Sequence, residues 1–261
     1  MPVKTIQSRG NPEFRHLLGL AEEVRARRES GQTLLDGWHL IEAALQAGCI
    51  PRQLIRTEGR DWPAAVDGLP GAVPRLILSE PLIRALSPVK SPTGLMAVLD
   101  IPRPAVCAAA FAILLEDIQD PGNLGALLRT AAAAGVEAAY LSKGCADAWS
   151  PKTLRGGQGA HFLLAIHEQA DLIAVAEGFA GTVYAAALGA AASLYELDLR
   201  RPTAFAFGNE GAGLGAALQQ VCRPFMVPMP GRVESLNVAA AAAICLFERV
   251  RQLQGAASIA G

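Results

Sequence analysis

Residues 111–118, FAILLEDI, begin with an unbroken apolar run that constrains the fold more than any other stretch of the chain. A strand without apolar–polar alternation is typical of a parallel sheet buried on both faces. Residues 124–134 follow with helical apolar spacing. Further apolar runs predict strands at 138–142, 161–166, 181–187, 203–208 and 223–229, and residues 238–254 predict a long helix. This alternation predicts a doubly covered, mostly parallel α/β sheet.

The preceding part of the chain predicts a smaller α/β module. Residues 11–30 read as one charged helix, and residues 33–35 as a short strand followed by a helix that ends at Gly48. The runs PRQLIRT, PRLILS and TGLMAVLDI predict strands, and EPLIRALS predicts a helix. The proline-marked segment 102–105 separates the two parts, which gives domains at 1–103 and 104–261.

Composition excludes several classes of protein. No apolar run reaches the ~18 residues of a membrane span, and the first residues lack the apolar core of a signal peptide. Five scattered cysteines contain no C-x-x-C pair, and four histidines contain no H-x-x-x-H pair. A disulfide framework and a metal site are therefore not expected. We expect a soluble, cytoplasmic protein without a membrane contact.

Charge is nearly balanced overall, at −1, but its distribution is uneven. The first 28 residues hold six basic and three acidic side chains. One interpretation is a solvated helix face. The other is a patch that contacts phosphate groups. Its candidate residues are Arg9, Arg25, Arg27 and Arg28.

Turns rich in glycine or proline follow three of the predicted strands. They read DPGNLG (120–125), GNEGAGLG (208–215) and PMPGRVESLN (228–237). Ligands of open parallel sheets bind at the carboxyl ends of strands, where such loops gather. The second turn lacks the terminal Gly-Lys-Ser/Thr of a P-loop. It also comes too late in the chain for the glycine fingerprint of a dinucleotide-binding fold, which follows the first strand.

Several polar residues in these loops have both a structural and a functional interpretation. Asn123 is suited to cap the helix that follows it, and Ser235 or Asn237 to cap the last helix. Arg129 lies off the apolar stripe of its helix and either solubilises the surface or points towards the same mouth as Asn123.

Taken together, the three loops resemble the motifs of the SpoU (TrmH-type) RNA ribose 2′-O-methyltransferases of the SPOUT superfamily. The residues that carry the resemblance are DPGNLGALLRTA, GNEGAGL and PMPGRVESLNV, within about 105–250. Residues 1–103 resemble more loosely the L30e-like substrate-binding domain of that family, through RESGQTLLDGWHLIEAAL and SPTGLMAVL. Asp36, Gly157 and Ala239 stand where many members have glutamate, serine and serine.

This resemblance implies a parallel sheet with a C-terminal trefoil knot, a homodimer with the final helix in its interface, and S-adenosylmethionine as cofactor. By position, the cofactor-binding residues would be Gly208, Val227, Met229 and Leu236. The resemblance assigns the catalytic role to Arg129, sometimes as general base, with Asn123, Glu210, Ser235 and Asn237 around it. Because arginine stays protonated at neutral pH, we favour a role in clamping the RNA phosphate and orienting the 2′-hydroxyl.

The resemblance also points to an RNA substrate. An added L30e-like domain favours 23S ribosomal RNA by analogy with the family. Two alternatives remain at this stage. One is a transfer RNA 2′-O-methyltransferase, and the other is a non-catalytic RNA-binding assembly factor with the same fold.

Overall fold

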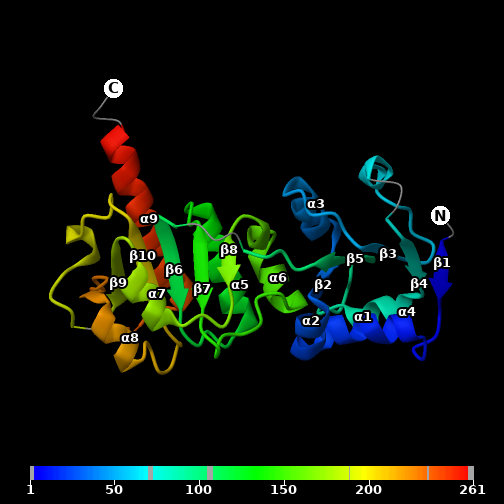
Figure 1. Ribbon diagram of the computed structural model, residues 1–261, viewed down its shortest axis with the longest axis horizontal. Helices are drawn as coiled ribbons and strands as arrows, with labels where there is room; N and C mark the ends of the chain where they lie inside the picture. The colour runs from blue at the N-terminus through cyan, green and yellow to red at the C-terminus, as the bar shows by residue number, and fades with distance from the viewer. Residues whose placement is uncertain (1–2, 70–72, 105–107, 188, 234, 258–261) are drawn as a thin grey trace. The chain divides into compact units, whose positions relative to one another are not determined.

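The computed structural model describes residues 3–257 except 70–72, 105–107, 188 and 234 (Figure 1). The chain forms two compact units. The first contains Met1–Arg103 together with Trp149–Phe162, and the second contains Pro104–Ala148 together with Leu163–Gly261. The chain therefore passes between the units three times.

The first unit is built on a five-stranded mixed sheet in the order β1-β4-β3-β5-β2. Strand β5 is antiparallel to β2 and β3, and the remaining pairs are parallel. Helices α1 and α4 pack on one face through Phe14, Leu17, Leu82 and their neighbours, and α3 covers the other face (Figure 1). The elements are β1 (Lys4–Ile6), α1 (Pro12–Glu22), α2 (Val24–Ser30), β2 (Gln32–Asp36), α3 (Trp38–Gln46), β3 (Gln53–Thr57), η1 (Ala64–Gly68), β4 (Arg75–Leu78), α4 (Glu80–Leu86) and β5 (Leu95–Asp100).

The single helix predicted over residues 11–30 is divided in two. Glu23 adopts an extended conformation (φ −111°, ψ 118°) between α1 and α2. The break leaves carbonyl groups of the last turn of α1 without helical partners. Arg27 Nη1 donates a 2.6 Å hydrogen bond to the Leu20 carbonyl and so stabilises the end of α1. The sequence did not reveal this capping role.

Residues Trp149–Phe162 leave the second unit and pack with the first. They form α6 (Pro151–Gly157) and η2 (Ala160–Phe162). Thr33 Oγ1 donates a 2.6 Å hydrogen bond to the Trp149 carbonyl, and the Trp149 ring packs against His161 and Phe162. The strand predicted over 161–166 is therefore wrong in its first part, and β8 begins only at Ala165.

The second unit confirms the predicted parallel sheet. Its six strands run in the order β11-β9-β10-β6-β7-β8, and every pair is parallel. Helices α5 and α9 pack together on one face, and α7 and α8 cover the other (Figure 1). The elements are β6 (Phe111–Leu115), α5 (Pro121–Ala133), β7 (Ala138–Leu141), β8 (Ala165–His167), α7 (Leu172–Gly178), β9 (Thr182–Ala186), η3 (Leu194–Glu196), β10 (Thr203–Phe207), α8 (Ala216–Val221), β11 (Arg223–Phe225) and α9 (Val238–Ala257).

Candidate functional site

The three motif loops follow β6, β10 and β11. Strands β6 and β10 are neighbours in parallel register, so the loops after Leu115 and Phe207 start side by side. Strand β11 lies two positions from β10, beyond β9, and the loop after Phe225 leads into α9. The carboxyl edge of the sheet therefore carries all three loops, as expected for a ligand site in a parallel sheet.

Helix α5 starts three residues earlier than the sequence suggested. Its N-cap is Asp120, whose carboxylate accepts a 2.7 Å hydrogen bond from the Asn123 backbone amide. The prediction that Asn123 caps this helix is therefore wrong. Because Asp120 takes that role, the Asn123 side chain is left to contact other loops.

One hydrogen-bonded chain of side chains joins the three loops. Asn123 Nδ2 donates to Glu210 Oε1 at 2.6 Å, and Asn237 Nδ2 donates to Asn123 Oδ1 at 3.1 Å. Asn237 Oδ1 in turn accepts from the backbone amides of Ala239 and Ala240, so Asn237 is the N-cap of α9. Each asparagine amide uses one N–H and its oxygen in these bonds, which fixes the orientation of both amides and leaves the second N–H of each for a ligand.

The Gly208–Gly215 loop is held in place by residues that the sequence reading did not single out. Asn209 Nδ2 donates to the Asp117 carbonyl at 3.0 Å, and its Oδ1 accepts from the amides of Gly211 and Ala212. Glu116 Oε2 accepts from the Gly215 amide at 2.6 Å. These bonds tie the loop to the end of β6 and set the position of Glu210. The signal in the sequence was a polar residue within two positions of the end of each of these two strands.

Gly208 is required by the close packing of this loop on itself. A Cβ atom at position 208 would overlap the backbone of Gly213 and Leu214. The backbone at the end of β10 therefore carries no side chain that could keep a ligand away from it. This is the environment in which a ligand can contact main-chain groups directly.

Arg129 does not take part in this hydrogen-bond network. Its side chain is exposed and forms no hydrogen bond or ion pair with any residue that the structure describes. It lies six residues after Asn123 on α5, which is about 9 Å along the axis and about 240° around it. Among the described residues, Glu210 accepts a hydrogen bond from Asn123 and none from Arg129. That Arg129 points towards the same mouth as Asn123 stays a prediction.

The loop between β11 and α9 leaves its backbone available to a ligand. Among its described residues, Val227 to Leu236 form no backbone hydrogen bond with one another or with other described residues. Val227 and Met229 are half-buried, while Ser235 is exposed and Leu236 is 37% exposed. Free main-chain groups next to apolar side chains suit a purine ring and an amino-acid head group, so this loop fits a nucleoside-containing cofactor such as S-adenosylmethionine.

The described cysteines are poor candidates for a base or nucleophile at this site. Burial, with a contribution from the Glu116 carboxylate, raises the pKa of the Cys222 thiol to about 11. Burial also raises the pKa of Cys245 to about 12 and that of Cys145 above its usual range. A thiol in such surroundings stays protonated at neutral pH.

The predicted N-terminal patch is only partly on the surface. Arg9, Arg25 and Arg28 are exposed, and Arg25 pairs with Glu29 at 2.6 Å. Arg27 is only 3% exposed because it caps α1. The expectation that Arg27 contributes an exposed cation is therefore not met.

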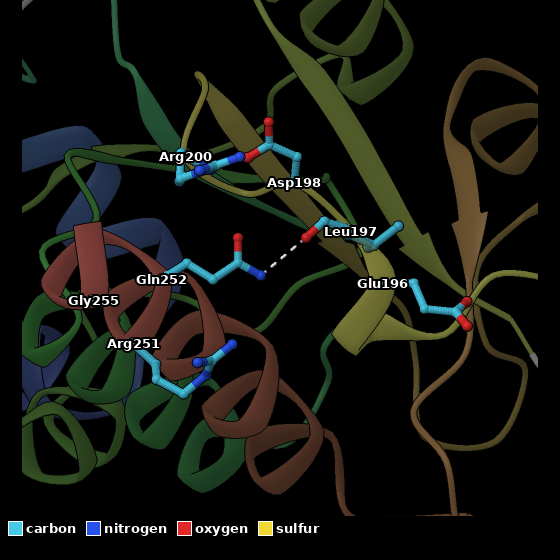
Figure 2. Close-up of a pocket in the computed structure, with 7 residues that line it drawn as sticks. All are labelled: Glu196, Leu197, Asp198, Arg200, Arg251, Gln252 and Gly255. Atoms are coloured by element: carbon cyan, nitrogen blue, oxygen red, sulfur yellow. Dashed lines mark hydrogen bonds and ion pairs between the residues drawn. The ribbon is translucent and has the colours of Figure 1, made fainter. Parts of the chain in front are cut away.

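A hollow of about 390 Å³ in the second unit lies away from the motif loops (Figure 2). It contains none of the predicted site residues, and it is lined by Glu196, Leu197, Asp198 and Arg200 and by Arg251, Gln252 and Gly255 of α9. Figure 2 shows Gln252 reaching from α9 to the Leu197 carbonyl, to which its Nε2 donates at 2.9 Å. Its Oε1 accepts from the Leu199 amide at 2.9 Å. Gln252 thus anchors the helix whose opposite end carries Asn237.

No group of three or more metal-binding side chains occurs among the described residues. Within the same part of the chain, no helix is long and apolar enough to cross a membrane.

Known proteins and family models match this chain in sequence. Residues 110–247 match the family model described as SpoU rRNA Methylase family, and residues 11–97 match an MRM3-like substrate binding domain. The uncharacterized tRNA/rRNA methyltransferase slr1673 of Synechocystis sp. is 35% identical, covering 99% of this chain and 97% of its own length. The 23S rRNA (guanosine(2553)-2′-O)-methyltransferase RlmP of Bacillus subtilis is 35% identical, covering 94% of this chain and 98% of its own.

Solved structures agree with these relatives. The AdoMet-bound rRNA methyltransferase from Sinorhizobium meliloti is 26% identical with a TM-score of 0.81, covering 96% of this chain and 98% of that one. The chain belongs to the SpoU rRNA methylase family. The predicted family, α/β fold, enzyme class and S-adenosylmethionine dependence are thereby confirmed.

Replacing Gly208 tests the close packing of the second loop. Gly208→Ala places a methyl group against the Gly213 backbone, so the loop must shift, and we expect the Kd for S-adenosylmethionine to rise at least about tenfold, or ~1.4 kcal/mol. Isothermal titration calorimetry measures this. Gly211→Ala is the matched control, because its added Cβ would lie 3.4 Å from Asn209 Oδ1. Equal affinities for the two variants would contradict the packing argument.

Proposed function

We propose that the protein transfers a methyl group from S-adenosylmethionine to a ribose 2′-oxygen of 23S ribosomal RNA. The observation that carries this proposal is the Glu210–Asn123–Asn237 chain, which links one polar residue from each motif loop at the carboxyl edge of the sheet. The relative from Bacillus subtilis named above as a 23S rRNA 2′-O-methyltransferase supports the choice of RNA.

The cofactor would be held mainly by backbone groups of the second and third loops. Gly208, Val227, Met229 and Leu236 are the residues that we assign to this role. Gly208 offers bare backbone at the end of β10, and the half-buried Val227 and Met229 offer apolar contacts. When bound, S-adenosylmethionine supplies an electrophilic methyl group on its sulfonium.

The protein's own residues would position the ribose. The 2′-oxygen would form a bond to the methyl carbon while the carbon–sulfur bond breaks and its electron pair stays on sulfur, and the hydroxyl proton would pass to solvent water. Asn123, Asn237 and Ser235 hold ribose hydroxyls, and Glu210 fixes the Asn123 amide. Arg129, which is exposed and forms no bond with a described residue, clamps the neighbouring RNA phosphate and orients the 2′-hydroxyl.

The two parts of the chain would divide binding and catalysis. We assign residues 1–103 to an L30e-like RNA substrate-binding domain and residues 104–261 to the methyltransferase domain. The match of residues 11–97 to a substrate binding domain supports this division. RNA contacts in the first domain are assigned to Arg9, Arg25 and Arg28, which are exposed.

The protein's oligomeric state, chain topology and cellular location are further parts of the proposal. We assign the protein to the cytoplasm, as a homodimer with α9 in its interface and a trefoil knot in the methyltransferase domain. Phe247 on α9 is 46% exposed and Leu253 is 38% exposed, which leaves apolar surface for a second copy to cover.

Methyl transfer from tritiated S-adenosylmethionine to purified RNA tests the function. We expect ribosomal RNA from a strain lacking the protein to accept the label, and ribose-methylation mapping to locate it in 23S rRNA. Label in transfer RNA alone would favour the transfer RNA alternative. Absence of transfer to either RNA would favour a non-catalytic assembly factor.

Arg129→Ala should reduce methyl transfer by at least about 10²-fold, because the phosphate clamp is lost, while the Kd for S-adenosylmethionine changes less than about twofold. Single-turnover transfer assays and calorimetry measure the two quantities. Arg15→Ala is a control, since Arg15 is exposed on α1 outside the motif loops. A collapse of cofactor affinity in Arg129→Ala would show that Arg129 is structural.

Replacing Arg9, Arg25 and Arg28 together by alanine should weaken RNA binding and flatten its dependence on salt, since each phosphate contact contributes roughly 0.7–0.9 to the logarithmic slope. Filter binding at several salt concentrations measures the slope. An unchanged slope would identify these residues as a solvated helix face.

Phe247→Asp should convert the dimer to monomers, because it places a charge in an apolar interface. Light scattering coupled to size-exclusion chromatography measures the mass. Tyr195→Asp is the control, since Tyr195 is 57% exposed on η3 rather than on α9. A dimer that persists in Phe247→Asp would place the interface elsewhere.

A further inference from the structure

A second hollow lies within the first unit and has walls of mixed chemistry. Its volume is about 390 Å³, within the range of ligand pockets. Three chain segments line it, at the junction of α1 and α2, at the end of α4 and at the start of α6. The lining residues are Ala21, Glu22, Arg27, Ala85, Leu86, Ser87, Pro88, Ser150, Pro151 and Lys152.

Two positive charges face this hollow. Lys152 is exposed and makes no hydrogen bond or ion pair with any described residue. Arg27 is 3% exposed, and its bond to the Leu20 carbonyl holds it in the wall of the hollow. Lys152 is therefore the side chain that can donate a charge-assisted hydrogen bond to an anion.

The remaining walls suit a nucleobase. Pro88, Pro151 and Leu86 present apolar surface, and the exposed Glu22 offers a carboxylate that accepts hydrogen bonds from a base edge. Ser87 is already committed, since its hydroxyl donates to the buried Asp36 at 2.5 Å. Sequence-specific proteins read RNA mainly through the unstacked bases of single-stranded loops, bulges and ends.

We propose that this hollow holds one unstacked nucleotide of the RNA substrate, with its phosphate beside Lys152 and its base against the proline-lined wall. The proposal rests on the proposed function and adds to it a recognition site remote from the residues assigned to methyl transfer. It also gives α6, which the methyltransferase part of the sequence contributes to the first unit, a role in reading the RNA.

Lys152→Glu tests the site without disturbing a contact among the described residues. We expect the Kd for in vitro transcribed 23S rRNA, measured by filter binding, to rise about tenfold or more. Arg15→Glu is the matched control, because it makes the same charge change on an exposed position of α1 that does not line the hollow. Its Kd should rise less than about threefold. Equal effects of the two variants would overturn the proposal and leave only a general electrostatic effect.

Ala85→Phe tests the cavity rather than the charge. A phenyl group in the hollow should raise the Kd for RNA about tenfold while the salt slope stays that of the wild type. Wild-type RNA affinity in a folded Ala85→Phe variant, checked by circular dichroism, would overturn the proposal. If this variant does not fold, the comparison of Lys152→Glu with Arg15→Glu decides the question.

The proposed function has a separate test in the same samples. All variants should bind S-adenosylmethionine like the wild type. A wild-type protein that transfers no methyl group would contradict the function, whereas an active wild type with an unaffected Lys152→Glu variant would contradict only the nucleotide site.

Discussion

The parallel direction of all six strands in the second sheet is the constraint on which the site depends. Parallel strands deliver their carboxyl ends to one edge, so loops that are far apart in sequence meet there. Asn123 and Asn237 are 114 residues apart and yet share a hydrogen bond. The sheet brings them near each other, but the final geometry depends on Asp120, which relieves Asn123 of capping α5, and on Asn209, which fixes the neighbouring loop.

The fold followed from the sequence where burial determines the pattern. The run at Phe111–Leu115 is buried throughout, and its lack of alternation correctly indicated a parallel strand. The prediction failed where a local contact decides the conformation. The break at Glu23 depends on Arg27 returning to the Leu20 carbonyl, and the loss of the strand at 161–162 depends on packing against Trp149. The local spacing of apolar residues shows neither the Arg27–Leu20 bond nor the packing against Trp149.

The site was predictable as a set of residues but not as a set of contacts. The motif residues Asn123, Glu210 and Asn237 were identified, and the structure joins them. Their partners were not identified, because polar residues such as Glu116 and Asn209 have many structural roles and no spacing signal separates those roles. The axial and angular separation of Arg129 from Asn123 can be calculated only if both residues lie in α5. The sequence did not show this, because α5 begins three residues before the expected start.

The excursion of Trp149–Phe162 into the first unit has a consequence for the modularity of this chain. Although two family models divide it near residue 100, the units are interlaced in sequence. A fragment beginning at residue 104 would carry α6 and the Trp149 ring without the strand that holds them, because Thr33 would be missing. The substrate-binding unit likewise lacks part of its structure when it is cut after residue 103. The two halves are therefore poor candidates for recombination as independent cassettes, and an exchange of either with a relative would need to transfer residues 149–162 as well.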